Sequence, residues 1–424
     1  MPADSVAAFR IGFGLLVAFS SIRFLAKGWV ETLYLAPDQH LTYRWFGWVE
    51  PLPAPAKYAW LAGLAVLGLC IAAGWHTRLA LGLFIVGFGY TELIDAALYL
   101  NHYWFMTLAA VTLLLLPVGG LWSADAAAGR VAGISHVPAW VVWVLRAQVG
   151  SVYVFAGIAK LNPDWLFEAQ PLSIWFAARS DGVLGPLLTL PGAAHGASWF
   201  GALFDCTIVG WLLWRRSRPW AYAGLVVFHL ATGALFAIGV FPWVMIVSAL
   251  IFFDPDWPRR LVGRPAPAPR QSSVAVAGRG AVVALGLFAV LQLALPLRHY
   301  AEDSNVRWSE EGYLLSWRVM LTEKAGTAEF EVTDPNSGRS WLVDPGEVLE
   351  DWQAATAVTR PDLIHGTAHL IAERYDEPGR DVQVRVQAWV SMNGEPARRI
   401  IDPAVDLAAH PRGEVPAGWI LPGP

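Results

Sequence analysis

The sequence has few charged residues and few cysteines, and each shortage excludes a class of protein. Charged residues make up 15% of the 424 residues and hydrophobic residues 55%, which is too apolar for an ordinary soluble domain. The two cysteines, Cys70 and Cys206, both lie within apolar runs and argue against a disulfide framework, although a single bridge between them stays open. The net charge of -4 gives no reason to expect a nucleic-acid partner. We find no convincing nucleotide-binding loop, haem motif or Ser/His/Asp arrangement, so those chemistries lack support.

Long apolar runs recur from the N-terminus to about residue 297 and indicate an integral membrane protein. Many of the 23 tryptophans fall at the ends of these runs, as amphipathic rings do at membrane interfaces. We expect an α-helical bundle of about nine spans, near residues 5–26, 58–74, 78–100, 103–121, 138–160, 195–214, 219–236, 238–253 and 281–297. The stretch 238–242 could instead form a re-entrant bend.

Positive charge predicts how this bundle is oriented. The two most basic short connections lie at 214–219 and between Arg259 and Arg279, and basic connections favour the cytoplasmic side. Nine spans with both connections inside put the N-terminus in the cytoplasm and the C-terminus outside. A stiff proline-rich linker is expected at 264–270, before the last span.

The composition changes after residue 297, where charged and polar residues become frequent. Residues 328–332, 340–343 and 381–390 alternate with period two, as half-buried strands do, and about 346–375 reads as one or two helices. We expect a transmembrane domain over 1–297. A small extracytoplasmic β-rich (α+β) domain of about 125 residues should follow over 298–424.

Lys160 ends a stretch that is otherwise apolar enough to lie in a bilayer. An ionisable group there is a functional candidate, although a lysine at a helix end can also snorkel to the headgroups. The sequence Leu161-Asn-Pro-Asp-Trp165 stops the helix with a proline and supplies an interfacial tryptophan. On the expected topology Lys160 and His102 both lie near the outer face, on the side of the C-terminal domain.

Other polar residues of the spans have structural readings. Glu92 and Asp95 should pair with Arg10, Arg78 or Arg146 and hold the bundle together.

In the outer domain, His365 and His369 have the spacing of a helical metal pair. They lack the adjoining glutamate and a third ligand, so we expect structural or surface histidines and no metal site.

Several motifs resemble those of the vitamin K-dependent gamma-glutamyl carboxylases, in the same order and with approximately the same spacing. The most specific is Val152-Tyr-Val-Phe-Ala-Gly-Ile-Ala-Lys-Leu-Asn-Pro-Asp-Trp165, which is similar to the active-lysine segment of that family. The other matching segments are Asn101-His102, His229 with Ala237–Phe241, Asp254–Leu261, Leu295–His299, Leu315–Trp317 and Arg399–Asp406. The resemblance covers nearly the whole chain. It suggests a bacterial homologue that carries the related horizontally transferred transmembrane (HTTM) domain, with Leu315 where the animal enzymes have tyrosine.

The resemblance implies a lyase-class carboxylase that uses reduced vitamin K, O2 and CO2. In the family, a lysine deprotonates the hydroquinone, oxygen addition gives a strong base, and that base removes a γ-proton from glutamate before CO2 is captured. The lysine must act as a neutral amine, which an apolar surrounding favours. The resemblance implies that Lys160 is the base and that His102 and Asn101 donate hydrogen bonds to oxyanions. It also implies that Tyr153, His229 and Phe241 line the quinone site. Ser316 and Trp317 would bind the glutamate-bearing peptide.

Simpler readings stay open for some of these residues and for the protein. Phe241 could be core packing, and Trp317 could only anchor the outer domain at the interface. The expected partners are membrane lipid, quinone and a glutamate-containing peptide or protein. The alternatives are a vitamin K hydroquinone epoxidase without protein carboxylation and a non-catalytic lipid- or quinone-binding membrane protein. The substrate protein, the quinone side chain and the oligomeric state do not follow from the sequence.

Overall fold

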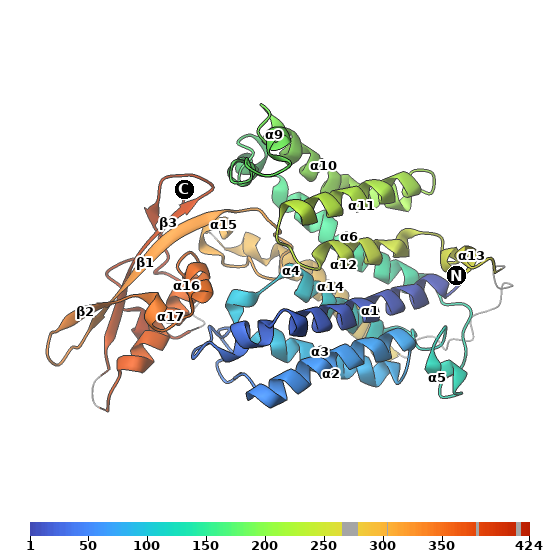
Figure 1. Cartoon of the computed structure of the whole chain (residues 1–424), viewed down its shortest axis with the longest axis horizontal. Helices are drawn as coiled ribbons and strands as arrows, with labels where there is room; N and C mark the ends of the chain where they lie inside the picture. The colour runs from blue at the N-terminus through green and yellow to red at the C-terminus, as the bar shows by residue number, and fades with distance from the viewer. Residues whose placement is uncertain (265–278, 303, 379–380, 413–416) are drawn as a thin grey trace.

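The chain forms a bundle of long helices with a small sheet domain at one end (Figure 1). The computed structural model describes residues 1–264, 279–302, 304–378, 381–412 and 417–424. The bundle helices are α1 (Asp4–Ala26), α2 (Ala54–Ala73), α3 (Thr77–Leu93), α4 (Asn101–Leu115), α6 (Ala139–Lys160), α10 (Ala193–Leu213), α11 (Arg218–Leu235), α12 (Phe241–Ala249) and α14 (Arg279–Leu297). Each overlaps one of the expected spans.

Fewer of these helices are suited to crossing a membrane than the sequence predicted. Within the described residues, five segments are long and apolar enough, namely α1, α2, α6, α10 and residues Val282–Ala301. Because a span needs about 20 residues, α3 with 17 and α4 with 15 fall short. The expected third span ran to residue 100, but α3 stops at Leu93 and the chain turns through a short 3-10 helix, Ala96–Leu98. The expectation of about nine spans is therefore not confirmed.

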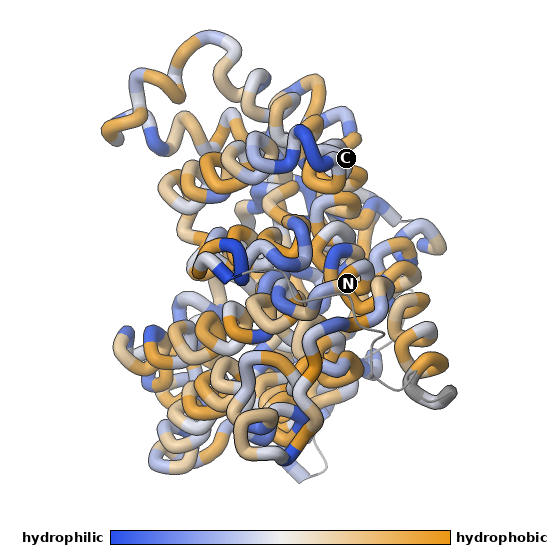
Figure 2. Tube along the Cα trace, turned by 90° about the vertical axis from the view of Figure 1, so that its right-hand side faces the viewer, coloured by the Kyte–Doolittle hydropathy of each residue, from blue (hydrophilic) through white to orange (hydrophobic). Residues whose placement is uncertain are grey.

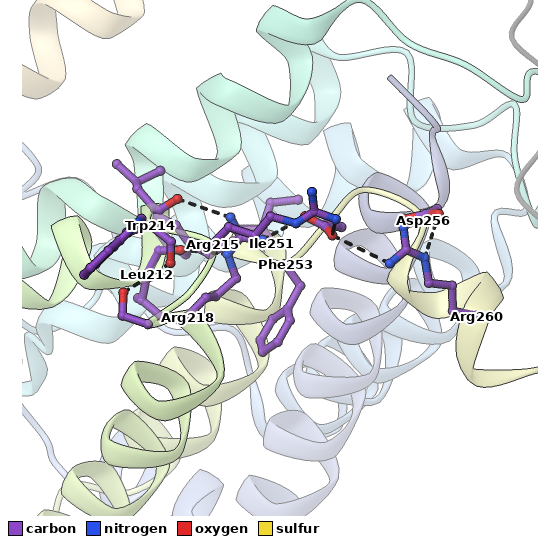
Figure 3. Close-up of polar contacts among 12 residues, drawn as sticks. Leu212, Trp214, Arg215, Arg218, Ile251, Phe253, Asp256 and Arg260 are labelled. Atoms are coloured by element: carbon purple, nitrogen blue, oxygen red, sulfur yellow. Dashed lines mark hydrogen bonds and ion pairs between the residues drawn. The ribbon is translucent and has the colours of Figure 1, made fainter.

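One end of the bundle is closed by ion pairs that lie away from the sheet domain (Figure 3). Asp254 accepts from Arg215 at 3.0 Å and from Arg218 at 2.9 Å, and Asp256 pairs with Arg260 at 2.8 Å. Figure 2 looks onto this end, where hydrophilic stretches join mostly hydrophobic helices. The segment 254–261, which carries part of the family resemblance, therefore ties the loop between α10 and α11 to the chain that follows α12 through these ion pairs.

The arginines expected to neutralise Glu92 and Asp95 lie at this same closed end. Arg10 donates to the Trp122 carbonyl at 2.7 Å, and Arg146 donates to the carbonyls at 251–253. Arg78 is exposed near the start of α3, whereas Glu92 and Asp95 lie at or beyond its other end. The expected pairing was wrong, because a helix of 17 residues separates the two sets of charges by about 25 Å.

The C-terminal domain, which we call the outer domain after its expected side of the membrane, is an antiparallel sheet with helices on one face. Its strands β1 (Lys324–Thr333), β2 (Ser340–Val343), β3 (Gln383–Met392) and β4 (Arg398–Arg399) have the order β2-β1-β3-β4. Alternate residues of β1 and β3 are buried, and Phe330 lies opposite Val386 in the register. They form one core with α17 (Pro361–Tyr375), which follows α16 (Asp351–Ala357). The three predicted strands and the helical stretch between them are confirmed.

Polar contacts fix the outer domain to the loops at one end of the bundle. Asp95 accepts from Gln353 of α16 at 2.7 Å and lies 3.2 Å from the His40 ring. On the far side of this joint, Asn393 donates to Asp164 at 2.9 Å. The loops after α1, α3 and α6 therefore hold the outer domain. Because α6 ends at Lys160 beside these loops, Lys160 lies near the outer domain, as the sequence predicted.

Two further expectations concern the cysteines and the linker. Cys70 and Cys206 are both free, so no bridge joins them. Residues 265–270 of the proline-rich linker lie outside the described residues.

Candidate active site at the Lys160 end of the bundle

Lys160 is buried at the C-terminus of α6 and paired with an acid from α10. Its side chain is 8% exposed, and Nζ lies 2.8 Å from Oδ2 of Asp205, which is 7% exposed. Gly157 makes this pairing geometrically accessible, because a Cβ there would lie only 2.8 Å from the backbone nitrogen of Cys206. Lys160 therefore does not snorkel to the surface, and its charge is balanced inside the protein.

Trp165 covers the same lysine from the short helix α7 (Pro163–Leu166). Lys160 Nζ lies 5.3 Å from the centre of the indole ring, and the Asn162 side chain caps α7 by accepting from the Trp165 backbone N–H. The indole N–H donates to the Ser198 carbonyl of α10 at 2.8 Å, and Trp165 is only 4% exposed. Trp165 thus covers the lysine, and its position relative to the membrane interface stays a prediction.

Tyr153 and His229 meet two helical turns below Lys160. Tyr153 lies seven residues before Lys160, about 10 Å along α6. Its hydroxyl lies 2.8 Å from Nε2 of His229 on α11, while Nδ1 of His229 is buried without a hydrogen-bond partner in the described part of the chain. A buried ring nitrogen without a partner can still bind a polar ligand atom.

Phe241 links the two histidines predicted for the site. Its ring centre lies 5.9 Å from that of His102 on α4 and 5.8 Å from that of His229. The structure therefore brings Tyr153, His229, Phe241 and His102 together as a continuous row of rings from four helices. This row lines the inside of the bundle at the end that faces the outer domain.

Asn101 contacts the chain that crosses from the bundle into the outer domain. Its amide donates to the Arg318 carbonyl at 3.4 Å and accepts from the Tyr99 hydroxyl at 3.2 Å. The same Tyr99 hydroxyl accepts the Leu315 backbone N–H at 2.9 Å. Asn101 thus holds this crossing segment beside His102.

Ser316 and Trp317 lie in that crossing segment, and both side chains point into the protein. Trp317 is 2% exposed and packs edge-on against Phe105 of α4 at 6.5 Å, while the Ser316 hydroxyl donates to the Tyr313 carbonyl. The backbone at Leu315, Trp317 and Met320 is left-handed, with φ between 53° and 61°. Non-glycine residues in that region are strained, and such strain clusters at functional sites.

A cavity of about 840 Å³ lies between the bundle and the outer domain. Trp104 and Thr107 line it from α4, whereas His102 and Phe105 of the same helix are buried in the bundle. Glu92 also faces this cavity, and we find no ion pair or hydrogen bond to it within the described residues. The described lining does not include Lys160 or the row of rings, so this cavity is separate from the buried lysine.

Asp205 is the main site residue that the sequence reasoning missed. It stands within the apolar run 195–214, and an acid in such a position is itself a signal for function. Lys57 of α2 was missed in the same way. Its side chain is fully buried, with Nζ lying 3.9 Å from the Tyr34 ring centre and without a hydrogen bond in the described structure.

Two family models match the chain, one after the other. The HTTM domain matches residues 1–257, which is more than half of the chain, and the lumenal domain of vitamin K-dependent gamma-carboxylase matches residues 278–424. No solved structure matches. The first match covers the helices that carry Lys160, Asp205, His102 and the row of rings, and the second covers the segment with Ser316 and Trp317. The chain therefore belongs to the vitamin K-dependent gamma-carboxylase family, as an HTTM domain followed by that family's lumenal domain.

Proposed function

We propose that this protein couples oxygenation of reduced vitamin K to its epoxide with γ-carboxylation of protein glutamate by CO2. The observation that carries the proposal is a lysine buried in the apolar end of a bundle, paired with Asp205, in a chain with both family domains. When bound with O2, the hydroquinone supplies the strong base that removes the glutamate γ-proton. The protein has to start that chemistry, exclude water from it and bring the glutamate to it.

Lys160 acts as the base that takes a proton from the hydroquinone. As the base, Lys160 begins as a neutral amine beside the ionised carboxylate of Asp205, and both side chains are buried. After uptake, the ammonium lies 2.8 Å from the Asp205 carboxylate, which balances its charge. Asp205 therefore positions the amine and stabilises its protonated form.

The row of rings suits a flat, apolar quinone with oxygen atoms at its edge. Phe241 offers an apolar face between His102 and His229, and His229 has a buried nitrogen free to contact an oxygen. His102 also makes no hydrogen bond within the described residues, so it is available as a donor to oxyanions that develop during the reaction. Such a donor contributes about 2.7–4 kcal/mol in comparable sites.

The glutamate-bearing peptide would enter from the side of the outer domain. Ser316 and Trp317 lie beside Asn101 and α4, so we assign this crossing segment to peptide binding. The outer domain would then be extracytoplasmic, with the N-terminus in the cytoplasm of a bacterial inner membrane. A dry site also protects the carbanion from water, which would otherwise quench it.

A direct assay tests this function and separates it from epoxidation alone. Purified protein in lipid discs would receive vitamin K hydroquinone, O2, a glutamate-containing peptide and ¹⁴CO2. We expect quinone epoxide and ¹⁴C-labelled peptide to form together, and both to depend on the hydroquinone. Epoxide without labelled peptide would contradict carboxylation, and neither product would favour a quinone- or lipid-binding protein.

A further inference from the structure

Two histidines of the outer domain converge on one backbone carbonyl. His365 and His369 lie one turn apart on α17, and their Nε2 atoms are 3.1 Å from each other. The same two atoms lie 3.0 Å and 2.9 Å from the carbonyl oxygen of His410. Three electron-rich atoms from two distant parts of the chain therefore form a nearly equilateral triangle.

No arrangement of protons satisfies this triangle. A carbonyl oxygen only accepts, so each ring nitrogen must carry a proton to bond with it. If both Nε2 atoms carry protons, two donors face each other across 3.1 Å, and if only one does, a bare nitrogen faces the oxygen. One edge of the triangle is mismatched in every protonation state, whereas a cation above the plane of the triangle would accept a lone pair from all three atoms.

The surroundings also suit neutral, metal-binding imidazoles. Burial lowers the pKa of His365 to about 4 and also lowers the pKa of His369, so both rings are neutral at pH 7. The Leu407 carbonyl is a second backbone acceptor for the His365 ring, and such contacts orient imidazoles that bind metals.

The charges around the triangle have both signs. The positive charge of Arg412 opposes a cation, but Arg412 donates to the Thr42 carbonyl at 2.7 Å. The negative carboxylates of Glu373 and Asp406, which also act on His369, favour a cation. The net charge of these groups around the two histidines is therefore not positive.

We propose that His365, His369 and the His410 carbonyl bind a divalent transition-metal ion that fastens the C-terminal segment to α17. Neighbouring ligands of an octahedral ion with bonds of about 2.1 Å lie about 3.0 Å apart, which matches the three edges. Imidazole ligands favour Zn²⁺, Ni²⁺, Co²⁺ or Cu²⁺ over Mg²⁺ and Ca²⁺. No group of three His, Cys, Asp or Glu side chains in the described residues could hold a metal, so the main-chain ligand is essential to this site. The site also borders the 840 Å³ cavity through His365.

Metal titration of the whole protein tests the proposal. The protein is purified without a polyhistidine tag, stripped with a chelator and titrated with Co²⁺, which is followed by visible absorption and calorimetry. We expect one equivalent to bind per chain, Zn²⁺ to displace it, and binding to weaken by more than about 10-fold in His365→Gln and His369→Gln. Zn²⁺ should also raise the thermal unfolding midpoint of the wild type but not that of His369→Gln.

A third histidine provides the matched control. His195 of α10 lies 3.1 Å from the Phe167 carbonyl but has no second imidazole beside that oxygen, so His195→Gln should bind Co²⁺ like the wild type. If His365→Gln fails to fold, Co²⁺ binding by His369→Gln decides the test, because His369 is the more exposed of the two side chains. The proposal is overturned if the wild type binds no stoichiometric metal, if His369→Gln binds as tightly as the wild type, or if His195→Gln loses the same affinity.

Discussion

Lys160 and Asp205 form a buried ion pair between α6 and α10, with 2.8 Å between Nζ and Oδ2. Removing one partner of a buried pair leaves an uncompensated charge, which costs about 3–5 kcal/mol, whereas apolar replacement of both partners is often neutral. We therefore expect Asp205→Leu to lower the free energy of unfolding by that amount, and Lys160→Met with Asp205→Leu to restore most of it. Denaturant unfolding of the three proteins in detergent measures this. A double variant as unstable as Asp205→Leu would contradict the pairing.

Lys160→Ala should abolish oxygen-dependent hydroquinone oxidation in protein that is still folded and inserted, although the unpaired Asp205 should also cost this variant about 3–5 kcal/mol of stability. A small primary amine added at alkaline pH should restore part of the rate, because it can occupy the space of the missing side chain and act as the base. Lys57→Met is the matched control, since Lys57 is also a buried lysine of a bundle helix and lies outside the proposed site. Full activity of Lys160→Ala would remove this lysine from the mechanism, and loss of folding without rescue would leave it structural.

The orientation of the bundle can be tested by cysteine labelling. In a background of Cys70→Ala and Cys206→Ala, single cysteines at positions 215 and 264 should label only from the cytoplasm. A cysteine at position 162, beside the outer domain, should label only from outside. Labelling of position 215 from outside would reverse the proposed topology.

Ser316→Ala and Trp317→Phe test the proposed peptide site. Loss of a contact made equally in the ground and transition states raises KM for the peptide, by about 5-fold for 1 kcal/mol, and leaves kcat unchanged. Hydroquinone oxidation should stay nearly intact. Trp317 is 2% exposed, so phenylalanine is the informative replacement, because alanine would cost about 3–5 kcal/mol of stability.

Leu342→Ala, on the exposed surface of β2, is a suitable control for Ser316 and Trp317. Equal loss of quinone oxidation and peptide carboxylation in Trp317→Phe would show that the segment does not serve peptide binding alone. Destabilisation as the only effect would leave Trp317 as an anchor.

The outer domain of the metal-free protein should lose stability in acid. Burial lowers the pKa of His365 to about 4 from an unfolded value near 6.5, so between these pH values the unfolded chain binds more protons than the folded one. Stability should therefore be full above pH 6.5 and fall by roughly 3 kcal/mol as the pH drops to 4. Urea unfolding followed by tryptophan fluorescence measures this slope, and His365→Gln should flatten it. An unchanged slope in that variant would assign the acid sensitivity to other groups.

The sequence predicted local features of this fold well, because they depend on short-range patterns. Period-two alternation located β1, β2 and β3, and apolar runs located the bundle helices. The ends of α3 were less predictable, since an apolar run continues past Leu93 into a loop that packs on the outer domain.

Pairing between distant residues was less accessible from the sequence. Asp205 reaches Lys160 because the backbone of α10 approaches Gly157, and the spacing of residues in one chain does not encode that approach. Asp95 was expected to meet an arginine, yet it accepts from the neutral amide of Gln353. Charge matching alone overlooked a hydrogen bond that satisfies the same buried carboxylate.

The joint at Asp95 has a consequence for how the protein is made. Gln353 follows Asp95 by 258 positions, and Arg412 follows Thr42 by 370. Both partners are therefore synthesised long after the bundle loops that they contact. Until then, the buried carboxylate of Asp95 and the carbonyl of Thr42 must bond to water or to other groups. Any shortened product that ends before residue 353 would lack the amide that donates to the buried carboxylate of Asp95.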